Sequence, residues 1–247
     1  MSDKVAVFDT TLRDGEQAAG TRLGSREKLM LAGQLAQLNV DVIEAGYPAS
    51  SPEDFDAVDL ICREIHGPSI CALSRAVASD IEACGKALAK ARKPRIHTGI
   101  GASDIHIAGK FQDQKYGSTM GQKKVKILQM AVAAVRQARQ YCDDVEFYAE
   151  DAGRADPPYL FEMLQAAIDA GATVVNIPDT TGYAMPEQYG GLIRSIREKV
   201  PNIAGATISV HCHDDLGLAV ANTLAGVLNG ARQVEGTKGI EIGRAHV

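Results

Sequence analysis

Short apolar runs alternate along the chain with longer stretches whose apolar positions recur every three or four residues. The short runs predict eight strands, at residues 5–11, 40–46, 69–74, 95–101, 144–151, 173–181, 208–215 and 233–237. They are rich in β-branched residues and have the length of buried strands. Strands that alternate with helices indicate a parallel sheet, because two parallel strands need a crossover connection and a helix is the usual one.

The stretches between the strands have the spacing of helices with one buried face. Apolar residues fall at i, i+3, i+7 and i+10 from Phe55 and again from Val125. A third helix is predicted after Asp156, a favourable N-cap that is followed by two prolines, and Gly171 ends it. Pro186 opens another helix in the same way. A long lysine-bearing loop is expected at 102–126, either as a solvated face or as a surface that attracts phosphates.

The number of strand and helix units favours a closed barrel over an open sheet. Eight units in 247 residues match the (β/α)8 TIM barrel. A doubly wound sheet often carries a glycine-rich phosphate turn, and no G-x-G-x-x-G follows the first strand. We therefore predict an α/β TIM barrel over residues 1–240, truncated after the eighth strand because too little chain follows it to form a helix.

Composition removes several classes of function. The net charge is −5 and no basic cluster alternates with aromatic residues, so we expect no nucleic-acid partner. No apolar run approaches the roughly 20 residues of a membrane span, and the first residues do not resemble a signal peptide. A cytoplasmic protein with no membrane partner is expected. The five cysteines lack C-x-x-C spacing, which predicts reduced, mostly buried thiols.

The carboxyl ends of barrel strands build the active site of this fold, and polar residues collect at the predicted ends. They are Asp9, Arg13, Asp14, Glu44, His97, Glu150, Asp151, Asp179, Thr180, His211 and His213. His211 and His213 are two apart on one strand, so their side chains point to the same side, about 6.6 Å apart along the chain.

The H-x-H pair predicts a metal site, in which Asp14 would complete a set of nitrogen and oxygen ligands for a divalent ion. Mg, Mn and Zn all accept such ligands. The alternative is that both histidines are hydrogen-bonded residues of the core or rim. Asp214 and Asp215 have a milder explanation, since an acid at the start of the next helix caps its free N–H groups.

Six segments resemble the 2-isopropylmalate synthase family, part of a group of metal-dependent barrels that includes homocitrate synthase, citramalate synthase and hydroxymethylglutaryl-CoA lyase. They are "FDTTLRDGEQ" at 8–17, "IEAGYPASSPEDF" at 43–55, "RIHTGIGASDIH" at 95–106, "EFYAEDAGR" at 146–154, "NIPDTTGY" at 176–183 and "HCHDDLGLAVAN" at 211–222. The resemblance implies an acyltransferase that condenses acetyl-CoA with 2-oxoisovalerate and hydrolyses the thioester, the committed step of leucine biosynthesis. It also implies a homodimer.

The resemblance assigns roles to the strand-end residues. Arg13 would be catalytic and stabilise the oxyanion, unless it only pairs with Asp9 or Glu44. The residues implied to bind the substrate are Arg13, Glu44, His97, Tyr148 and Thr180, with Glu44 also supporting the metal shell; Glu150 is a second catalytic candidate that would contact the keto acid. Glu150 could act as a general acid or base if burial raises its pKa. Tyr148 departs from the family, where many members have serine.

The end of the chain departs further from the family. Where the family continues with G-I-G-E-R-A-G-N, whose asparagine completes the metal site, this chain reads "KGIEIGRAHV". Residues 241–247 match the translation of a common sequencing adapter, so we interpret them as a non-native tail. A stop codon directly after Val247 on independent template DNA would contradict this.

Other functions stay open at this point. A homocitrate or citramalate synthase would share every metal ligand and use another 2-oxo acid. An aldolase or lyase would not hydrolyse a thioester. The chain could also be an inactive barrel that binds a metal and a keto acid.

Overall fold

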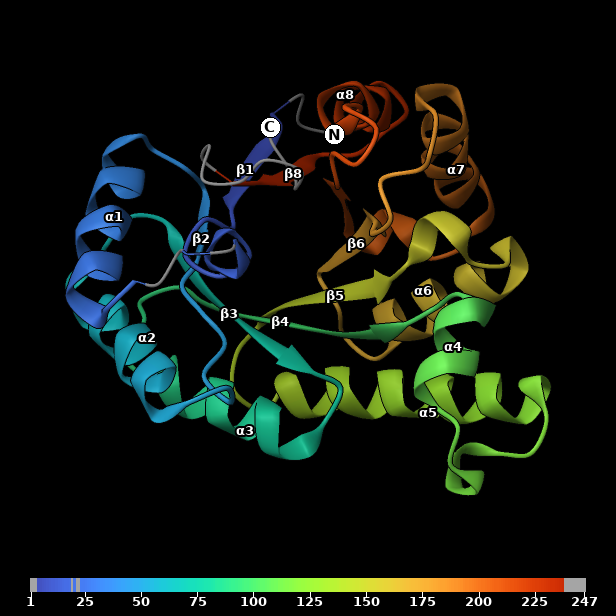
Figure 1. Cartoon of the computed structure of the whole chain (residues 1–247), viewed down its shortest axis with the longest axis horizontal. Helices are drawn as coiled ribbons and strands as arrows, with labels where there is room; N and C mark the ends of the chain where they lie inside the picture. Colours follow the sequence, from blue (N-terminus) through green and yellow to red (C-terminus); the bar gives the residue numbers. More distant parts are fainter. Residues whose placement is uncertain (1–3, 19, 21–22, 238–247) are drawn as a thin grey trace.

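The computed structural model describes residues 4–18, 20 and 23–237, and its eight strands close into one parallel barrel (Figure 1). The strands are β1 (Ala6–Asp9), β2 (Val42–Glu44), β3 (Ser69–Arg75), β4 (Pro94–Gly101), β5 (Asp144–Glu150), β6 (Val174–Asp179), β7 (Thr207–Cys212) and β8 (Gln233–Gly236). Each pairs with its neighbours in sequence, and β1 pairs with β8. The predicted TIM barrel is confirmed, with every strand inside its predicted range or within one residue of it.

Helices surround the barrel (Figure 1). They are α1 (Ser25–Gln37), α2 (Pro52–Glu64), α3 (Ala78–Ala87), α4 (Asp104–Lys110), α5 (Met120–Ala138), α6 (Pro157–Asp169), α7 (Pro186–Lys199) and α8 (Ala219–Leu228). Four short 3-10 helices join them: η1 (Gly15–Gln17), η2 (Gln114–Tyr116), η3 (Ala152–Arg154) and η4 (Ile203–Gly205). The four helices predicted from the sequence are α2, α5, α6 and α7.

Local sequence explains where these helices begin and end. Ser51 caps α2 by accepting a hydrogen bond from the Asp54 amide. Asp156 occupies the N-cap position of α6 as predicted, although its side chain makes no capping bond. Gly171 follows α6 with a φ of 113°, a conformation that favours glycine. The caps therefore fix the helix lengths that carry the chain back to the next strand.

The segment 102–126 is not the loop that was predicted. It contains α4, η2 and the first turns of α5. Helix α4 is only seven residues long and buries a single side chain, Ile107, so its apolar pattern is too weak to reveal a helix. Its start is set by Ser103, whose hydroxyl accepts a hydrogen bond from the His106 amide.

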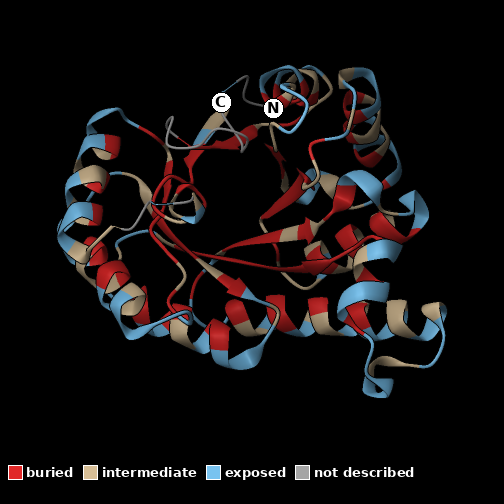
Figure 2. Ribbon diagram, viewed as in Figure 1, coloured by how far each residue is buried: buried red, intermediate tan, exposed pale blue. Residues whose placement is uncertain are grey.

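Buried residues follow the barrel wall and the helix faces that contact it (Figure 2). Helix α8 packs against α7, but no described helix covers β8 and β1 between α8 and α1 (Figure 1). Three apolar residues on α8, Val220, Leu224 and Leu228, are exposed. Residues 241–247, interpreted as a non-native tail, lie outside the described residues.

All five cysteines are free and buried, as predicted. In the part of the chain that the structure describes, no helix has the length and apolar character needed to cross a membrane.

Truncating a barrel-facing helix residue tests this packing. Leu164 of α6 is 0% exposed, whereas Leu224 of α8 is 58% exposed. We expect Leu164→Ala to lower the free energy of unfolding by about 2–5 kcal/mol, because it leaves a cavity in the core. Leu224→Ala should change it by no more than about 0.5 kcal/mol. Urea unfolding measures both, and equal losses would contradict this account of the core.

Candidate metal and substrate site

A cavity of about 510 Å³ opens at the carboxyl ends of the strands. Seven of the eight strands or the loops that follow them contribute to its lining, which comprises Arg13, Asp14, Gln17, Leu73, Arg75, His97, Lys110, Tyr148, Glu150, Asn176, Pro178, Thr180, His211, His213, Asp215 and Glu235. The strand-end residues named from the sequence therefore converge on one cavity, with the exceptions of Asp9, Glu44, Asp151 and Asp179.

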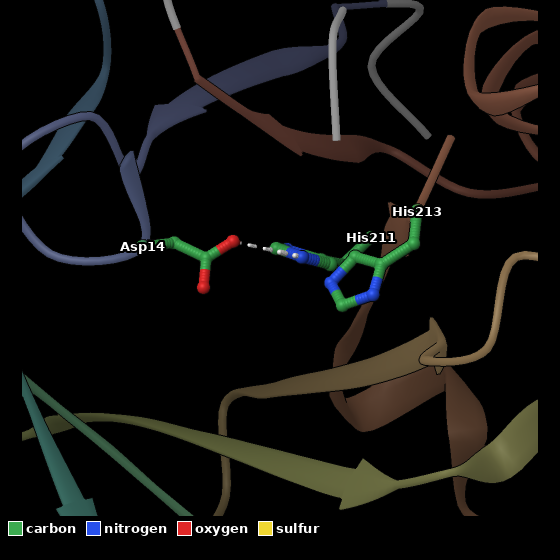
Figure 3. A group of neighbouring side chains, drawn as sticks. All are labelled: Asp14, His211 and His213. Carbon is green, nitrogen blue, oxygen red and sulfur yellow. Dashed lines mark ion pairs between the residues drawn. The ribbon is translucent and has the colours of Figure 1, made fainter. Parts of the chain in front are cut away.

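Asp14, His211 and His213 meet at this cavity (Figure 3). One ligand atom from each lies within 4.8 Å of the others. Asp14 Oδ2 is 3.6 Å from His211 Nε2. The side chain of Cys212, between the two histidines, is buried in the core instead. The geometry thus brings together the three residues that were predicted as metal ligands.

Hydrogen bonds at the far side of each imidazole orient the pair. His213 Nδ1 donates to the carbonyl oxygen of Thr180 at 2.7 Å, and His211 Nδ1 lies 3.2 Å from Glu235 Oε2. A carbonyl only accepts, so His213 carries its proton on Nδ1 and keeps the Nε2 lone pair for a ligand. Burial lowers the pKa of both histidines. This favours the neutral form that a metal ion binds.

Arg13 is held beside the three candidate ligands by two carboxylates. Its Nε donates to Glu44 Oε2 at 2.6 Å, and Nη1 donates to Asp14 Oδ1 at 2.7 Å. Glu44 is thus an observed partner of Arg13, as predicted. Glu44 is completely buried and also accepts a hydrogen bond from His97 Nδ1 at 2.8 Å. Burial alone would raise the pKa of Glu44, but the charge of Arg13 and the hydrogen bond of His97 lower it.

Three further residues predicted to bind substrate line the same cavity. His97 meets the ring of Tyr148 edge-on, with ring centres 4.9 Å apart. Tyr148 donates its hydroxyl to the carbonyl oxygen of Ser74 at 3.2 Å. Thr180 accepts from the Asp151 amide at 2.9 Å. These bonds fix the side chains around the cavity before any ligand enters.

Glu150 lines the cavity beside α4. Its charged neighbours lower its pKa, whereas a general acid needs a raised one. His106 Nε2 lies 3.2 Å and Lys110 Nζ 3.5 Å from its Oε2. Burial would raise the pKa of Glu150, but these two neighbours lower it. The condition of a raised pKa is therefore not met, and Glu150 is a carboxylate that can accept a proton.

The acids after His213 divide between two roles. Asp214 Oδ1 accepts a hydrogen bond from the Ala219 amide at 3.0 Å, which caps the first turn of α8 as predicted. Asp215 lines the cavity instead, and its carboxylate lies against Gly182.

Sequence reasoning missed Glu235, whose carboxylate contacts the candidate ligand His211 from inside the barrel. Its Oε1 accepts from Asn176 Nδ2 and from Ser209 Oγ, both at 2.6 Å, while Oε2 faces His211. Glu235 is completely buried. Gln233 and Glu235 alternate on one short strand, and this spacing of polar residues was the signal that could have found them.

A second buried acid, Glu146, lies deeper in the barrel. Its carboxylate accepts hydrogen bonds from Gln233 Nε2 at 2.8 Å and from Arg95 Nη1 at 3.1 Å. Burial, with the neighbouring Glu235, raises the pKa of Glu146 to about 8 against the opposing charges of His97 and Arg95. Hydrogen bonds therefore run through the barrel interior from Arg95 to His211.

Two other clusters contain residue types that can bind a metal ion, but their chemistry is less suitable. One consists of Glu44, Cys71 and His97. The other consists of His97, Glu146 and Glu235. Burial raises the pKa of Cys71 well above its ordinary value, so it stays a thiol. The carboxylates are already bonded inside the barrel. Asp14, His211 and His213 are therefore the favoured candidate for a metal site.

Comparison with known proteins places this geometry in a family. A family model described as HMGL-like matches residues 4–240. The chain belongs to the HMGL-like family. Curated relatives named 2-isopropylmalate synthase include those of Salinibacter ruber (55% identity over 96% of this chain and 43% of the relative) and Parabacteroides distasonis (53%, 96% and 46%). The chain thus spans less than half the length of these relatives.

Solved structures support the fold of this HMGL-like chain. The HMG-CoA lyase of Bacillus subtilis aligns with a TM-score of 0.78 at 19% identity, covering 99% of this chain and 83% of the lyase. The hydroxymethylglutaryl-CoA lyase of Pseudomonas aeruginosa gives 0.74 at 22% identity, covering 96% and 77%. At these identities the likeness concerns the barrel alone.

The metal site can be tested by binding. We expect His213→Ala to abolish tight Mn²⁺ binding, and Glu235→Gln to weaken it about 10–100-fold because His211 loses its charged partner. The exposed His66 provides the control, since His66→Ala should leave affinity unchanged. Isothermal titration calorimetry measures all three. Unchanged affinity in His213→Ala would contradict the assignment.

The raised pKa of Glu146 predicts how stability depends on pH. Because the folded pKa is above the unfolded one, protonated Glu146 stabilises the fold below pH 4.5, and this contribution is lost as pH rises through about 8. We therefore expect the free energy of unfolding of Glu146→Gln, measured in urea, to rise relative to that of the unmodified protein as pH increases from 4.5 to about 8. The exposed Glu64→Gln variant should show no such trend. Parallel curves for Glu146→Gln and the unmodified protein would contradict the raised pKa.

Proposed function

We propose that this chain is the catalytic barrel, over residues 1–240, of a 2-isopropylmalate synthase. It would condense acetyl-CoA with 2-oxoisovalerate to give 2-isopropylmalate and CoA, the first committed step of leucine biosynthesis. The observation that carries the proposal is the cluster of Asp14, His211 and His213 with Arg13 at its side, on a cavity at the strand ends. Curated relatives of that name at 51–55% identity support it.

The donor set fits a resident divalent ion, Mg, Mn or Zn. Two imidazoles present Nε2 from fixed rings, and a buried carboxylate faces them. When bound, the ion would supply a Lewis acid for the carbonyl of the keto acid. Arg13 would stabilise the negative charge that develops on that oxygen, because Glu44 and Asp14 hold its guanidinium beside the site.

The remaining lining residues would bind and orient the two substrates. His97 and Thr180 offer polar groups to the keto acid, and Tyr148 closes the wall next to His97. Glu150 would take a proton from the methyl group of acetyl-CoA, and the carbon would then attack the keto carbon. Water would afterwards cleave the thioester, releasing CoA as a thiol.

The finer features of the protein are also proposals. A homodimer in the cytoplasm is consistent with the resemblance. Homocitrate and citramalate synthases would use the same ligands with another 2-oxo acid, and an inactive barrel would bind metal and keto acid without turnover. The choice among 2-oxo acids depends on the cavity wall formed by Leu73, Tyr148 and Pro178.

The direct test is release of CoA thiol from acetyl-CoA with added divalent metal, offering 2-oxoisovalerate, 2-oxoglutarate and pyruvate separately. We expect release to prefer 2-oxoisovalerate, to be lost in His213→Ala and to persist in His66→Ala. Preference for another acid would indicate a sister synthase. Metal binding without release from any acid would contradict the proposal.

A further inference from the structure

Helix α4 is tied to the end of β5 at several points. The Ala102 amide donates to the carbonyl oxygen of Glu150 at 2.8 Å. Ser103, the N-cap of α4, donates its hydroxyl to Asp151, the residue after Glu150, and accepts from the His106 amide. The helix start and the strand end therefore form one connected unit at the rim of the cavity.

Two side chains of α4 converge on one oxygen of Glu150. His106 and Lys110 are four residues apart, so they lie on the same helix face. His106 Nε2 is 3.2 Å and Lys110 Nζ is 3.5 Å from Glu150 Oε2. The ion pairs are recorded at Oε2, and no hydrogen bond reaches Glu150 Oε1 within the described part of the chain. The side chain lines the cavity and is 32% exposed. The carboxylate is thus held by one oxygen while the other stays available.

The ring of His106 packs tightly against Gly101. A Cβ added to Gly101, at the end of β4, would lie 1.7 Å from His106 Nδ1, so the ring packs directly on the glycine backbone. Nδ1 is buried and has no hydrogen-bond partner among the described residues. A proton on Nδ1 would be left unsatisfied, which places the proton on Nε2, the ring nitrogen 3.2 Å from the Glu150 carboxylate.

We infer that His106 and Lys110 are positioning residues: they hold Glu150 through Oε2 as a carboxylate and leave Oε1 to accept the proton from the acetyl methyl group. In this step a methyl C–H bond breaks and an O–H bond forms at Oε1. The C–H electron pair forms the new bond to the keto carbon, while the π pair of the keto C=O bond moves onto its oxygen, where Arg13 would stabilise the charge. The inference rests on the proposed function. The lowered pKa of Glu150 agrees with it.

Matched substitutions at His106 separate the hydrogen bond from the bulk of the side chain. His106→Gln keeps an N–H donor near the place of Nε2, whereas His106→Leu removes it. We expect His106→Leu to lower kcat by about 100-fold, because the base is misplaced, with KM for the keto acid and Mn²⁺ affinity within twofold. His106→Gln should recover most of the rate. Equal rates for the two variants, or a loss confined to KM, would overturn the inference.

A second measurement does not depend on catalysis. The pKa of Glu150 can be followed by NMR of ¹³C-labelled carboxylates, with the signal assigned through Glu150→Gln. Tyr148, on the same strand, also interacts with this carboxyl, because burial and the charge of Glu150 raise the pKa of its hydroxyl. Arg13 and Arg75 line the same cavity. We expect the double variant His106→Leu/Lys110→Met to raise the pKa of Glu150 above 4.5, because burial is then uncompensated.

The two readouts distinguish the ways in which the account can fail. An unchanged Glu150 pKa in the double variant would overturn the positioning role, whatever the enzyme does. A raised pKa in a protein that releases no CoA would leave the hold on Glu150 supported and would overturn the proposed reaction.

Discussion

The pairing of β1 with β8 is the constraint on which the site depends. In this register Phe8 lies beside Glu235 and Asp9 beside Gly236, while β8 in turn pairs His211 with Glu235. Closure therefore brings the loop after β1, which carries Asp14, to within 3.6 Å of a histidine near the other end of the chain. In an open sheet the first and last strands would be edges, and the three candidate ligands would not meet.

Closure also creates an interior in which polar groups must be satisfied. Barrel interiors are usually filled by branched apolar side chains. Here β4, β5, β7 and β8 bury two acids, an arginine, an amide and a hydroxyl that bond to one another, which offsets the cost of removing them from water. The side chain of Glu235 links this interior to His211. The hydrogen-bonded interior thus supports His211 through Glu235. Glu150 is held separately, at the rim of the cavity, by two side chains of α4.

The sequence was sufficient for the strands and for the three candidate metal ligands that the structure brings together. Buried parallel strands give continuous apolar runs, and two-residue spacing sets His211 and His213 on one side. The sequence does not show which side of a strand faces the barrel interior, so Glu146 was missed, and for Glu235 the alternation with Gln233 was the signal that was overlooked. Helix α4 was missed because it buries only Ile107. The charge state of Glu150 depends on His106 and Lys110, which reach it from another element, and spacing along the chain cannot reveal that.

The central claim is that one divalent ion binds both imidazoles of the H-x-H pair together with Asp14. Pulsed electron paramagnetic resonance of the Mn²⁺-loaded protein tests this most directly, because it detects nitrogen nuclei bound to the ion. The account predicts coupling to two histidine nitrogens in the unmodified protein and to one in His211→Ala or in His213→Ala. Bound Mn²⁺ without nitrogen coupling would contradict it.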